Sequence, residues 1–236
     1  MQLDRDGAQH VPAALTPTET QALRDHFASV PATSPGTRLC SSPSPDGEGN
    51  HGKHGGGVSS VATLAGFLPP ATALAQTLLA PEARPIRATF FDKNPQRNWA
   101  LGWHQDRTIA LKARADFPGF GPWTVKSGLH HTVPPFALLE RMLTLRIHLD
   151  DTGPTNAPLL VSPGTHRLGR IPEPEITRAV ETHGTATCLA EAGDIWVYST
   201  PVLHASERAA APTRRRVLQL LYSADSLPPP LEWLGV

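Results

Sequence analysis

Prolines and glycines spread along the chain restrict its fold more than any other feature. The 236 residues include 25 Pro and 19 Gly. Proline fixes φ and removes a backbone donor, so it ends helices and is kept out of central strands. Hydrophobic residues still make up 39%, which is ordinary for a protein with a buried core once glycine is added. We therefore expect an ordered chain of short elements and many turns, and a bundle of long helices is disfavoured.

Short β-prone segments dominate the chain after residue 82. Each is rich in aliphatic or aromatic residues and is bounded by Gly, Pro, Asp or Asn. Many short strands separated by such turns favour a sandwich, barrel or jelly roll. No GxGxxG motif, P-loop or regular helix–strand alternation occurs, which argues against a nucleotide-binding α/β sheet. The predicted strands cover residues 86–91, 142–149, 159–162, 186–189, 195–199 and 217–222.

The N-terminal third predicts a helical cover over residues 13–81, preceded by a loose tail at 1–12. Thr16 is a good N-cap residue, proline follows it at the first helical position, and Glu19 completes the pattern of a capping box. This pattern predicts a helix that starts after Thr16 and continues to about Val30.

A segment rich in Ser, Pro and Gly follows that helix at residues 32–58. Its composition predicts a mobile loop, or a loop that orders on binding. Its two histidines, His51 and His54, are interpreted as solvated, because three glycines follow them and nothing fixes a ligand geometry. A second helical segment is predicted over residues 59–80, broken or restarted at the proline pair 69–70.

Charge and cysteine content restrict the partners and the compartment. Lys and Arg number 21 and Asp and Glu also number 21, without a long basic run, which argues against nucleic-acid or anionic-membrane partners. No stretch of 18 apolar residues and no apolar signal region occur. Cys40 and Cys188 lie far apart and outside any CxxC pattern. Free thiols are typical of a reducing cytosol, so we expect a cytoplasmic protein.

The pair His104-Gln105-Asp106 is the first candidate for chemistry. In an extended segment, residues i and i+2 point the same way, so the imidazole and the carboxylate can bind one metal ion. The pattern alone is weak, because His148 and Asp150 repeat it. With His204 as a third ligand, two histidines and one carboxylate would leave three open positions, the arrangement of non-haem Fe(II) oxygenases.

Open metal positions of this kind can hold a bidentate 2-oxo acid together with dioxygen. The far carboxylate of the 2-oxo acid would then require a cation, for which a planar arginine is best suited. Arg215 lies 11 residues after His204 at the start of a predicted strand, and Ser206 follows His204 by two residues. These two residues are therefore candidates for the co-substrate site.

Four segments in order carry a family resemblance: WHQD, PLLVSPGTHR, GDIWVYSTPVLHAS and RRRVLQLLYS. Over about residues 84–225 the chain resembles the phytanoyl-CoA dioxygenase family of Fe(II)/2-oxoglutarate oxygenases. The resemblance implies a mainly-β fold: a double-stranded β-helix (jelly roll, cupin-like) core at 84–225 with N-terminal and flanking α-helices. We expect residues 1–236 to form a single dioxygenase domain.

The resemblance also implies the roles of individual residues. His104, Asp106 and His204 would be the iron ligands and catalytic residues. Arg215 and Ser206 would bind the distal carboxylate of 2-oxoglutarate, with Gln105 nearby. The implied cofactor is Fe(II), with 2-oxoglutarate and dioxygen as co-substrates. The segment with Lys93, Asn98 and Trp99 indicates a bacterial-type subgroup, but neither their role nor the substrate follows from the sequence.

The carboxylate at position 106 bears on the reaction. Relatives that halogenate replace this carboxylate with a small residue, which opens a position for halide. Its presence here favours hydroxylation of a small organic substrate, with release of succinate and carbon dioxide. Two alternatives stay open: a catalytically inactive metal- or ligand-binding protein of the same fold, and a cupin-like metalloenzyme that uses no 2-oxo acid.

The rival pair His148 and Asp150 lies on a predicted strand whose other face is aliphatic. In the family pattern this is a core strand that ends in acidic turn residues, and its histidine is not a ligand.

The stretch 112–135 lacks regular periodicity, and segments of this kind are often functional. Its aromatic residues, which include Phe120 and Trp123, predict a lid over the site, and His130 and His131 would offer polar contacts to the substrate. The alternative is that these aromatics only close the open end of the barrel. Nothing in the sequence defines an oligomeric state.

Overall fold

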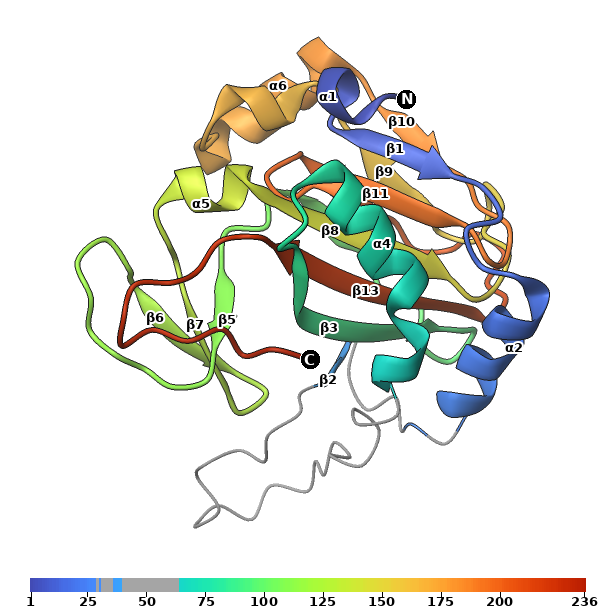
Figure 1. Cartoon of the computed structure of the whole chain (residues 1–236). Coiled ribbons are helices and arrows are strands. Elements are labelled where there is room, and N and C mark those ends of the chain that lie inside the picture. The colour runs from blue at the N-terminus through green and yellow to red at the C-terminus, as the bar shows by residue number, and fades with distance from the viewer. Residues whose placement is uncertain (29, 31–35, 40–63) are drawn as a thin grey trace.

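A computed structural model describes residues 1–28, 30, 36–39 and 64–236 (Figure 1). The described strands form three antiparallel sheets. The largest has six strands in the order β1-β11-β8-β13-β3-β2, and a four-stranded sheet has the order β10-β9-β12-β4. The third sheet, β5-β7-β6, lies beside them. The mainly-β, antiparallel class expected from the sequence is therefore confirmed.

The strands are short apart from β3, β8 and β13. The six-stranded sheet consists of β1 (Ala8–Val11), β11 (Ile195–Ser199), β8 (Met142–His148), β13 (Arg215–Ser223), β3 (Arg84–Lys93) and β2 (Thr37–Leu39). The four-stranded sheet consists of β10 (Ala186–Cys188), β9 (Leu159–Val161), β12 (His204–Ser206) and β4 (Leu101–His104). The third sheet consists of β5 (Ile109–Leu111), β7 (Leu129–Thr132) and β6 (Trp123–Lys126). All six strands predicted from the sequence are present within these bounds or close to them.

Helices in the described residues are also short. They are α1 (Leu3–Asp6), α2 (Pro17–His26), α4 (Pro69–Leu78), α5 (Phe136–Glu140) and α6 (Ile176–His183), with 3-10 turns at Ala65–Phe67, Thr165–Leu168 and Glu173–Glu175. The capping box is formed as predicted: the Glu19 backbone N–H donates to Thr16 Oγ1 at 3.2 Å, and the Thr16 N–H donates to the Glu19 carboxylate at 2.8 Å. Helix α4 begins at Pro69, where a restart was expected.

Helices α2 and α4 cover the outer face of the six-stranded sheet (Figure 1). Leu23 of α2 and Ala75 of α4 are fully buried in one cluster with Leu145 of β8 and Leu218 of β13. This cluster is the main core of the molecule. The opposite face of the sheet is turned toward the four-stranded sheet, and a smaller cluster that includes Val161 and Tyr198 lies there.

Strand β8 shows how the fold directs polar residues inward. Leu143, Leu145 and Ile147 belong to the main core, so alternation turns Thr144, Arg146 and His148 to the other face. All seven residues of β8 are buried. The sequence pattern predicted the aliphatic face, and the structure adds that the polar face lies in the interior between two sheets.

The prediction that residues 1–12 form a loose tail is wrong. Residues 3–6 form α1, and β1 pairs with β11 in antiparallel register, with Ala8 opposite Tyr198. The Asp194 carboxylate accepts the Ala13 N–H at 2.8 Å and lies 2.8 Å from His10 Nε2, which attaches the end of this segment. Four residues of mixed polarity carry no strand pattern, and the pairing edge that makes them a strand comes from a distant part of the chain.

The loop predicted at residues 32–58 is only partly described. Within it, Thr37–Leu39 form β2, an edge strand that pairs with β3. His51, His54 and Cys40 lie outside the described residues. Cys188, which is described, is a buried free thiol. None of the described helices is long and apolar enough to cross a membrane.

Candidate metal and co-substrate site

His104 and His204 face each other across two paired strands. His104 ends β4, His204 begins β12, and the two residues are partners in the antiparallel register. His104 Nδ1 donates to the Gly102 carbonyl at 2.8 Å, and His204 Nδ1 donates to the Val202 carbonyl at 3.0 Å. Because a carbonyl only accepts, each Nδ1 carries the proton and each Nε2 presents its lone pair, as metal ligation requires.

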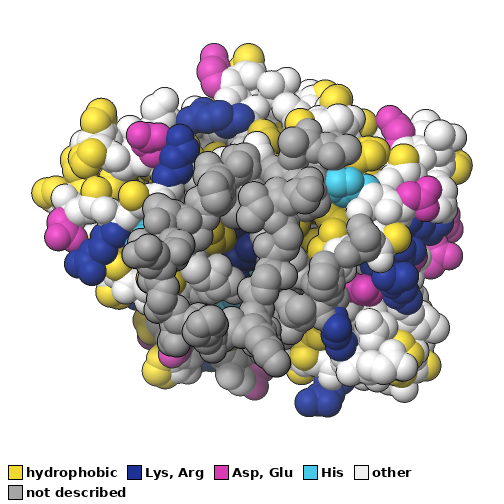
Figure 2. Space-filling view, turned by 90° about the horizontal axis from the view of Figure 1, so that it is seen from below, with side chains coloured by type: hydrophobic (Ala, Val, Ile, Leu, Met, Phe, Trp, Pro, Cys, Tyr) yellow, Lys and Arg dark blue, Asp and Glu magenta, His cyan; other side chains and the backbone are white. Residues whose placement is uncertain are grey.

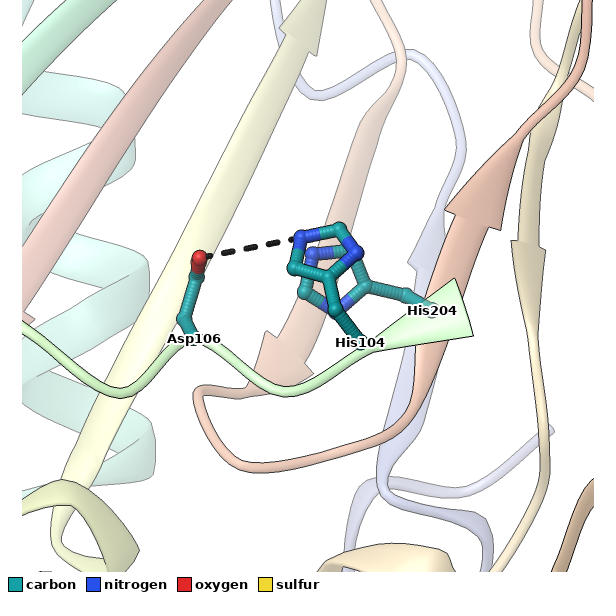
Figure 3. A group of neighbouring side chains, drawn as sticks. All are labelled: His104, Asp106 and His204. Carbon is teal, nitrogen blue, oxygen red and sulfur yellow. Dashed lines mark ion pairs between the residues drawn. The ribbon is translucent and has the colours of Figure 1, made fainter. Parts of the chain in front are cut away.

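Asp106 completes the group (Figure 3). Its Oδ1 lies 4.0 Å from His104 Nε2, and the ligand atoms of the three residues all lie within 4.8 Å of one another. Asp106 Oδ2 is buried and has no hydrogen-bond partner among the described residues. A buried carboxylate oxygen without a donor is costly, and a cation between it and two imidazole nitrogens would satisfy it. The three side chains therefore fit a metal ion of the two-histidine, one-carboxylate type.

The protonation states suit a metal as well. Burial, followed by the charge of His104, lowers the pKa of His204 to about 4, so this imidazole is neutral near pH 7. Burial works to raise the pKa of Asp106, but the surrounding positive groups, which include Arg87 and Arg146, together outweigh it and the pKa is lowered. Both ligands are therefore in the form that binds metal, without a proton to displace.

A cavity of about 420 Å³ adjoins the three ligands. The four-stranded sheet contributes His104, His204 and Ser206, and the six-stranded sheet contributes Arg146 and Arg215. The site therefore occupies the space between the two sheets, where the polar faces of β8 and β13 are turned.

Arg215 and Ser206 come from strands of different sheets, β13 and β12, but their side chains meet at one backbone carbonyl. Arg215, which is 2% exposed, donates from its guanidinium to the Ala157 carbonyl, and Ser206 Oγ donates to the same carbonyl at 3.3 Å. Arg215 Nε is buried with no acceptor among the described residues. A free donor next to a hydroxyl is an arrangement that can bind a carboxylate.

Lys93 lies behind this pair, and the sequence reasoning assigned it no role. Its fully buried ammonium donates to Ser206 Oγ at 3.3 Å and to the carbonyls of Trp99 and Glu207 at 2.8 and 2.9 Å. Burial, followed by the charge of Arg215, lowers its pKa to about 7. Asn98 adds a reciprocal pair of hydrogen bonds to the Ala209 backbone at 2.9 and 2.7 Å. Lys93, Asn98 and Trp99 thus attach the segment before β4 to the segment after β12.

Gln105 lies outside the cavity, contrary to the expectation that it is near the co-substrate. Its amide donates to the carbonyls of Gly169 and Pro201 at 2.9 and 2.8 Å and accepts the Ile171 N–H at 3.0 Å. Between His104 and Asp106, which both point to the metal site, the intervening side chain must point the other way. Gln105 therefore holds neighbouring loops in place.

The rival pair is engaged elsewhere. His148 is fully buried, and its Nδ1 lies 3.1 Å from Thr152 Oγ1. The Asp150 carboxylate accepts three hydrogen bonds from Arg216, at 2.8, 2.8 and 2.7 Å. With its carboxylate committed to an arginine, this pair is not available as a metal site.

The second half of the stretch 112–135 forms a hairpin of β6 and β7, whereas residues 112–122 contain no helix or strand, as the lack of periodicity predicted. Phe120 and Trp123 pack against a second hydrophobic cluster that contains Leu138 and Trp233, and they do not line the cavity. Their position matches the alternative in which the aromatics close one end of the fold. His130 is also absent from the cavity wall. His131 does line it, as do the residues at the hairpin tip, Lys126 and Ser127.

Three arginines of the cavity wall were missed by the sequence reasoning. Arg38, Arg87 and Arg146 come from β2, β3 and β8, which are far apart in sequence. The sequence shows only that some of these arginines lie within β-prone segments. It does not show that the three side chains converge on one cavity, because that depends on how the strands pair.

Facing antiparallel sheets with two histidines and one aspartate beside a cavity define the class of cupin-like non-haem metal enzymes. More specifically, the chain belongs to the phytanoyl-CoA dioxygenase (PhyH) family, and the match to this family spans residues 3–217. The expected family, the cupin-like fold and the Fe(II)/2-oxoglutarate-dependent enzyme class are thereby confirmed.

Solved structures show the same fold at low sequence identity. AviO1 from Streptomyces viridochromogenes Tue57 is 19% identical with a TM-score of 0.62, and the match covers 96% of this chain and 94% of AviO1. EctD from S. alaskensis, solved with 2-oxoglutarate and 5-hydroxyectoine, is 17% identical with a TM-score of 0.68, covering 99% of this chain and 77% of EctD.

A third structure comes from nogalamycin biosynthesis. SnoK, a non-haem alpha-ketoglutarate-dependent carbocyclase, is 15% identical with a TM-score of 0.62, covering 99% of this chain and 85% of SnoK. No curated protein matches the sequence.

Proposed function

We propose that this chain is an Fe(II)- and 2-oxoglutarate-dependent dioxygenase that hydroxylates a small organic substrate and releases succinate and carbon dioxide. The observation that carries the proposal is the convergence of His104, Asp106 and His204, with ligand atoms within 4.8 Å, on a cavity that also contains Arg215 and Ser206.

His104, Asp106 and His204 would hold the iron, which when bound supplies the activation of dioxygen. The carbonyls of Gly102 and Val202 fix the tautomer and orientation of both imidazoles. The lowered pKa of His204 keeps its ring neutral at pH 7, with the proton on Nδ1, so no proton has to leave Nε2 before the metal binds.

Arg215 and Ser206 would bind the distal carboxylate of 2-oxoglutarate. Both already share the Ala157 carbonyl, and the buried Nε of Arg215 still lacks an acceptor among the described residues. Lys93 donates to Ser206 from behind and would hold its hydroxyl in place. Burial lowers the pKa of Arg215, and the charge of Arg146 adds to this effect. A carboxylate at this point would relieve both costs.

Hydroxylation, rather than halogenation, is the reaction we infer, because the carboxylate of Asp106 occupies the position that a halide would need. The cavity shields His204 and Arg215, which are 5% and 2% exposed, whereas the His104 and Asp106 side chains are 29% and 25% exposed and lie on the side that a substrate can reach.

Succinate formation from 2-oxoglutarate under air tests the proposal without knowledge of the substrate. We expect slow formation of succinate by the iron-loaded protein and none by Asp106→Ala. Asp116→Ala is the matched control, because Asp116 is exposed and pairs only with Arg114. If the wild-type protein binds iron and 2-oxoglutarate but forms no more succinate than Asp106→Ala, it is a binding protein. If it binds iron but not 2-oxoglutarate, the cupin-like alternative without a 2-oxo acid replaces the proposal.

A further inference from the structure

The cavity wall is strongly cationic, although the chain as a whole has a formal net charge of zero. Among the described residues that line it, Asp106 is the only carboxylate. The Lys and Arg side chains on the same wall are Arg38, Arg87, Lys126, Arg146 and Arg215. Figure 2 shows the face below β2 and β3, where Lys and Arg side chains lie beside the grey residues.

These five cations form no ion pair with the described residues. Arg38 donates to Ser127 Oγ at 2.9 Å and Arg146 donates to Gln219 Oε1 at 2.8 Å, and both acceptors are neutral. Arg146 Nε is buried with no acceptor in the described part of the chain. Among the described residues, therefore, no carboxylate compensates the charges on this wall apart from Asp106.

The two arginines next to Arg215 in the sequence, Arg214 just before β13 and Arg216 within it, are each paired with a carboxylate. Arg214 donates two hydrogen bonds to the Asp92 carboxylate at 3.2 and 3.1 Å, and Arg216 is paired with Asp150. Within the described part of the chain, carboxylates thus pair with the arginines on either side of Arg215 but not with the arginines that line the cavity. Like charges at close range cost free energy, so the arrangement calls for an anionic partner.

Iron and 2-oxoglutarate do not provide that compensation together. Fe(II) carries two positive charges and 2-oxoglutarate two negative charges, so the pair adds no net charge to the cavity. Arg215 would be neutralised by one carboxylate, but the metal would restore the positive excess. Asp106 is the one carboxylate among the described residues of the wall, and four cations would still face the remaining space: Arg38, Arg87, Lys126 and Arg146.

Three of the cations form a group at the outer part of the wall. Burial, followed by the charge of Arg87, lowers the pKa of Arg38. The charges of Arg87, Arg38 and Lys126 all add to the burial that lowers the pKa of His131 to about 4. Arg38 also reaches the tip of the β6–β7 hairpin through Ser127. The three side chains come from β2, β3 and β6 and line the cavity together with His131.

We propose that the substrate is a small organic anion whose carboxylate or phosphate group is bound by Arg38, Arg87 and Lys126. This inference rests on the proposed function, because it places the substrate in the part of the cavity that 2-oxoglutarate leaves free. Two planar guanidinium groups and one ammonium can together satisfy all the oxygens of such a group. The cavity of about 420 Å³ also has to hold 2-oxoglutarate, which limits the substrate to a small molecule.

Binding of simple oxyanions tests the proposal. Sodium sulfate, as a tetrahedral probe, and sodium acetate, as a carboxylate probe, are titrated by calorimetry into the anaerobic protein loaded with Fe(II) and 2-oxoglutarate, at constant ionic strength. We expect saturable binding of at least one probe, weakened at least tenfold in Arg87→Gln and in Arg38→Gln. Arg114→Gln is the matched control, since Arg114 is exposed and pairs with Asp116. A preference for sulfate would indicate a phosphate group, and a preference for acetate a carboxylate.

A second arm compares small acids with their uncharged amides as stimulators of succinate formation. Stimulation by acids alone, lost in Arg87→Gln, supports the proposal. It is overturned if the probes bind equally to wild-type and both variants, or if uncharged amides stimulate as well as acids. The visible charge-transfer absorption of Fe(II) with 2-oxoglutarate, measured in the same samples, separates the two claims. An intact band without anion binding would reject only the anion site, whereas a missing band with iron bound would reject the proposed function.

Discussion

At the scale of single residues, the site depends on polar atoms that the fold buries without a full set of partners. Asp106 Oδ2 and Arg215 Nε are both buried without a hydrogen bond in the described part of the chain. Both residues line the cavity: Asp106 is one of the three metal ligands, and Arg215 lies beside Ser206. A protein that used neither metal nor co-substrate would have no compensation for these two groups.

Arg215 should determine the affinity for 2-oxoglutarate. Replacing it with Lys keeps the charge but removes the planar fork, so we expect the KM for 2-oxoglutarate to rise about tenfold, or about 1.4 kcal/mol, with a smaller change in kcat. Succinate formation measures both constants. Arg214→Lys is the control, because Arg214 pairs with Asp92 instead. An unchanged KM in Arg215→Lys would show that the co-substrate binds elsewhere.

Lys93 should make the stability of the protein depend on pH. Its pKa is about 7 in the folded protein and 10.5 as the ordinary value, so between these values the unfolded chain holds a proton that the folded chain has lost. The free energy of unfolding contributed by this residue therefore rises with pH across that window and is lowest below pH 7.

Urea unfolding of the apo-protein at pH 7 and pH 9 measures this contribution. We expect the gain in stability on going to pH 9 to be smaller in Lys93→Met than in wild-type. The control is Lys112→Met, because Lys112 is exposed and pairs with Glu232. Equal pH dependence in wild-type and Lys93→Met would show that Lys93 stays protonated in the fold.

At the scale of elements, pairing partners decide which weak patterns become structure. The six predicted strands were found because their aliphatic runs are bounded by turn residues. Strands β1, β4 and β12 are three or four residues long and of mixed polarity, so their sequences alone do not predict a strand. The β6–β7 hairpin was missed for the same reason.

Strand β1 offers a test of close packing. Gly7, which precedes it, has φ +78°, and a Cβ there would lie 2.4 Å from His166 Nδ1. Gly235 has the same φ of +78° with nothing within 4 Å. Gly235→Ala should cost about 1 kcal/mol from backbone strain alone. Gly7→Ala should cost about 1–3 kcal/mol more, measured by thermal or urea unfolding. Equal losses would mean that His166 moves aside freely.

Trp123, at the start of β6, is expected to stabilise the fold rather than to bind the co-substrate. Trp123 packs in the second hydrophobic cluster, so Trp123→Ala should lower the free energy of unfolding by about 2–3 kcal/mol and leave the affinity for 2-oxoglutarate unchanged. Urea unfolding and the KM for 2-oxoglutarate check the two expectations. Unchanged stability would contradict the packing role and return Trp123 to the lid hypothesis.

At the scale of the whole molecule, the metal ligands were more predictable than the rest of the site. His104 and Asp106 are two residues apart in the sequence. The chemistry of a two-histidine, one-carboxylate site made His204, Ser206 and Arg215 candidates, and the family resemblance implied their roles. The cationic wall was not predictable, because its five cations come from five strands and the net charge of zero conceals them. Gln105 was misplaced because a family resemblance indicates which segment lies near the site but not the direction in which each side chain of that segment points.

The most direct test of the account is the anaerobic visible absorption of the apo-protein titrated with Fe(II) and 2-oxoglutarate. The account predicts a metal-to-ligand charge-transfer band that disappears in Asp106→Ala, weakens in Arg215→Lys and is unchanged in Arg214→Lys. The absence of this band from folded wild-type protein, with iron demonstrably bound, would contradict the assignment of His104, Asp106 and His204 to an iron site that binds 2-oxoglutarate.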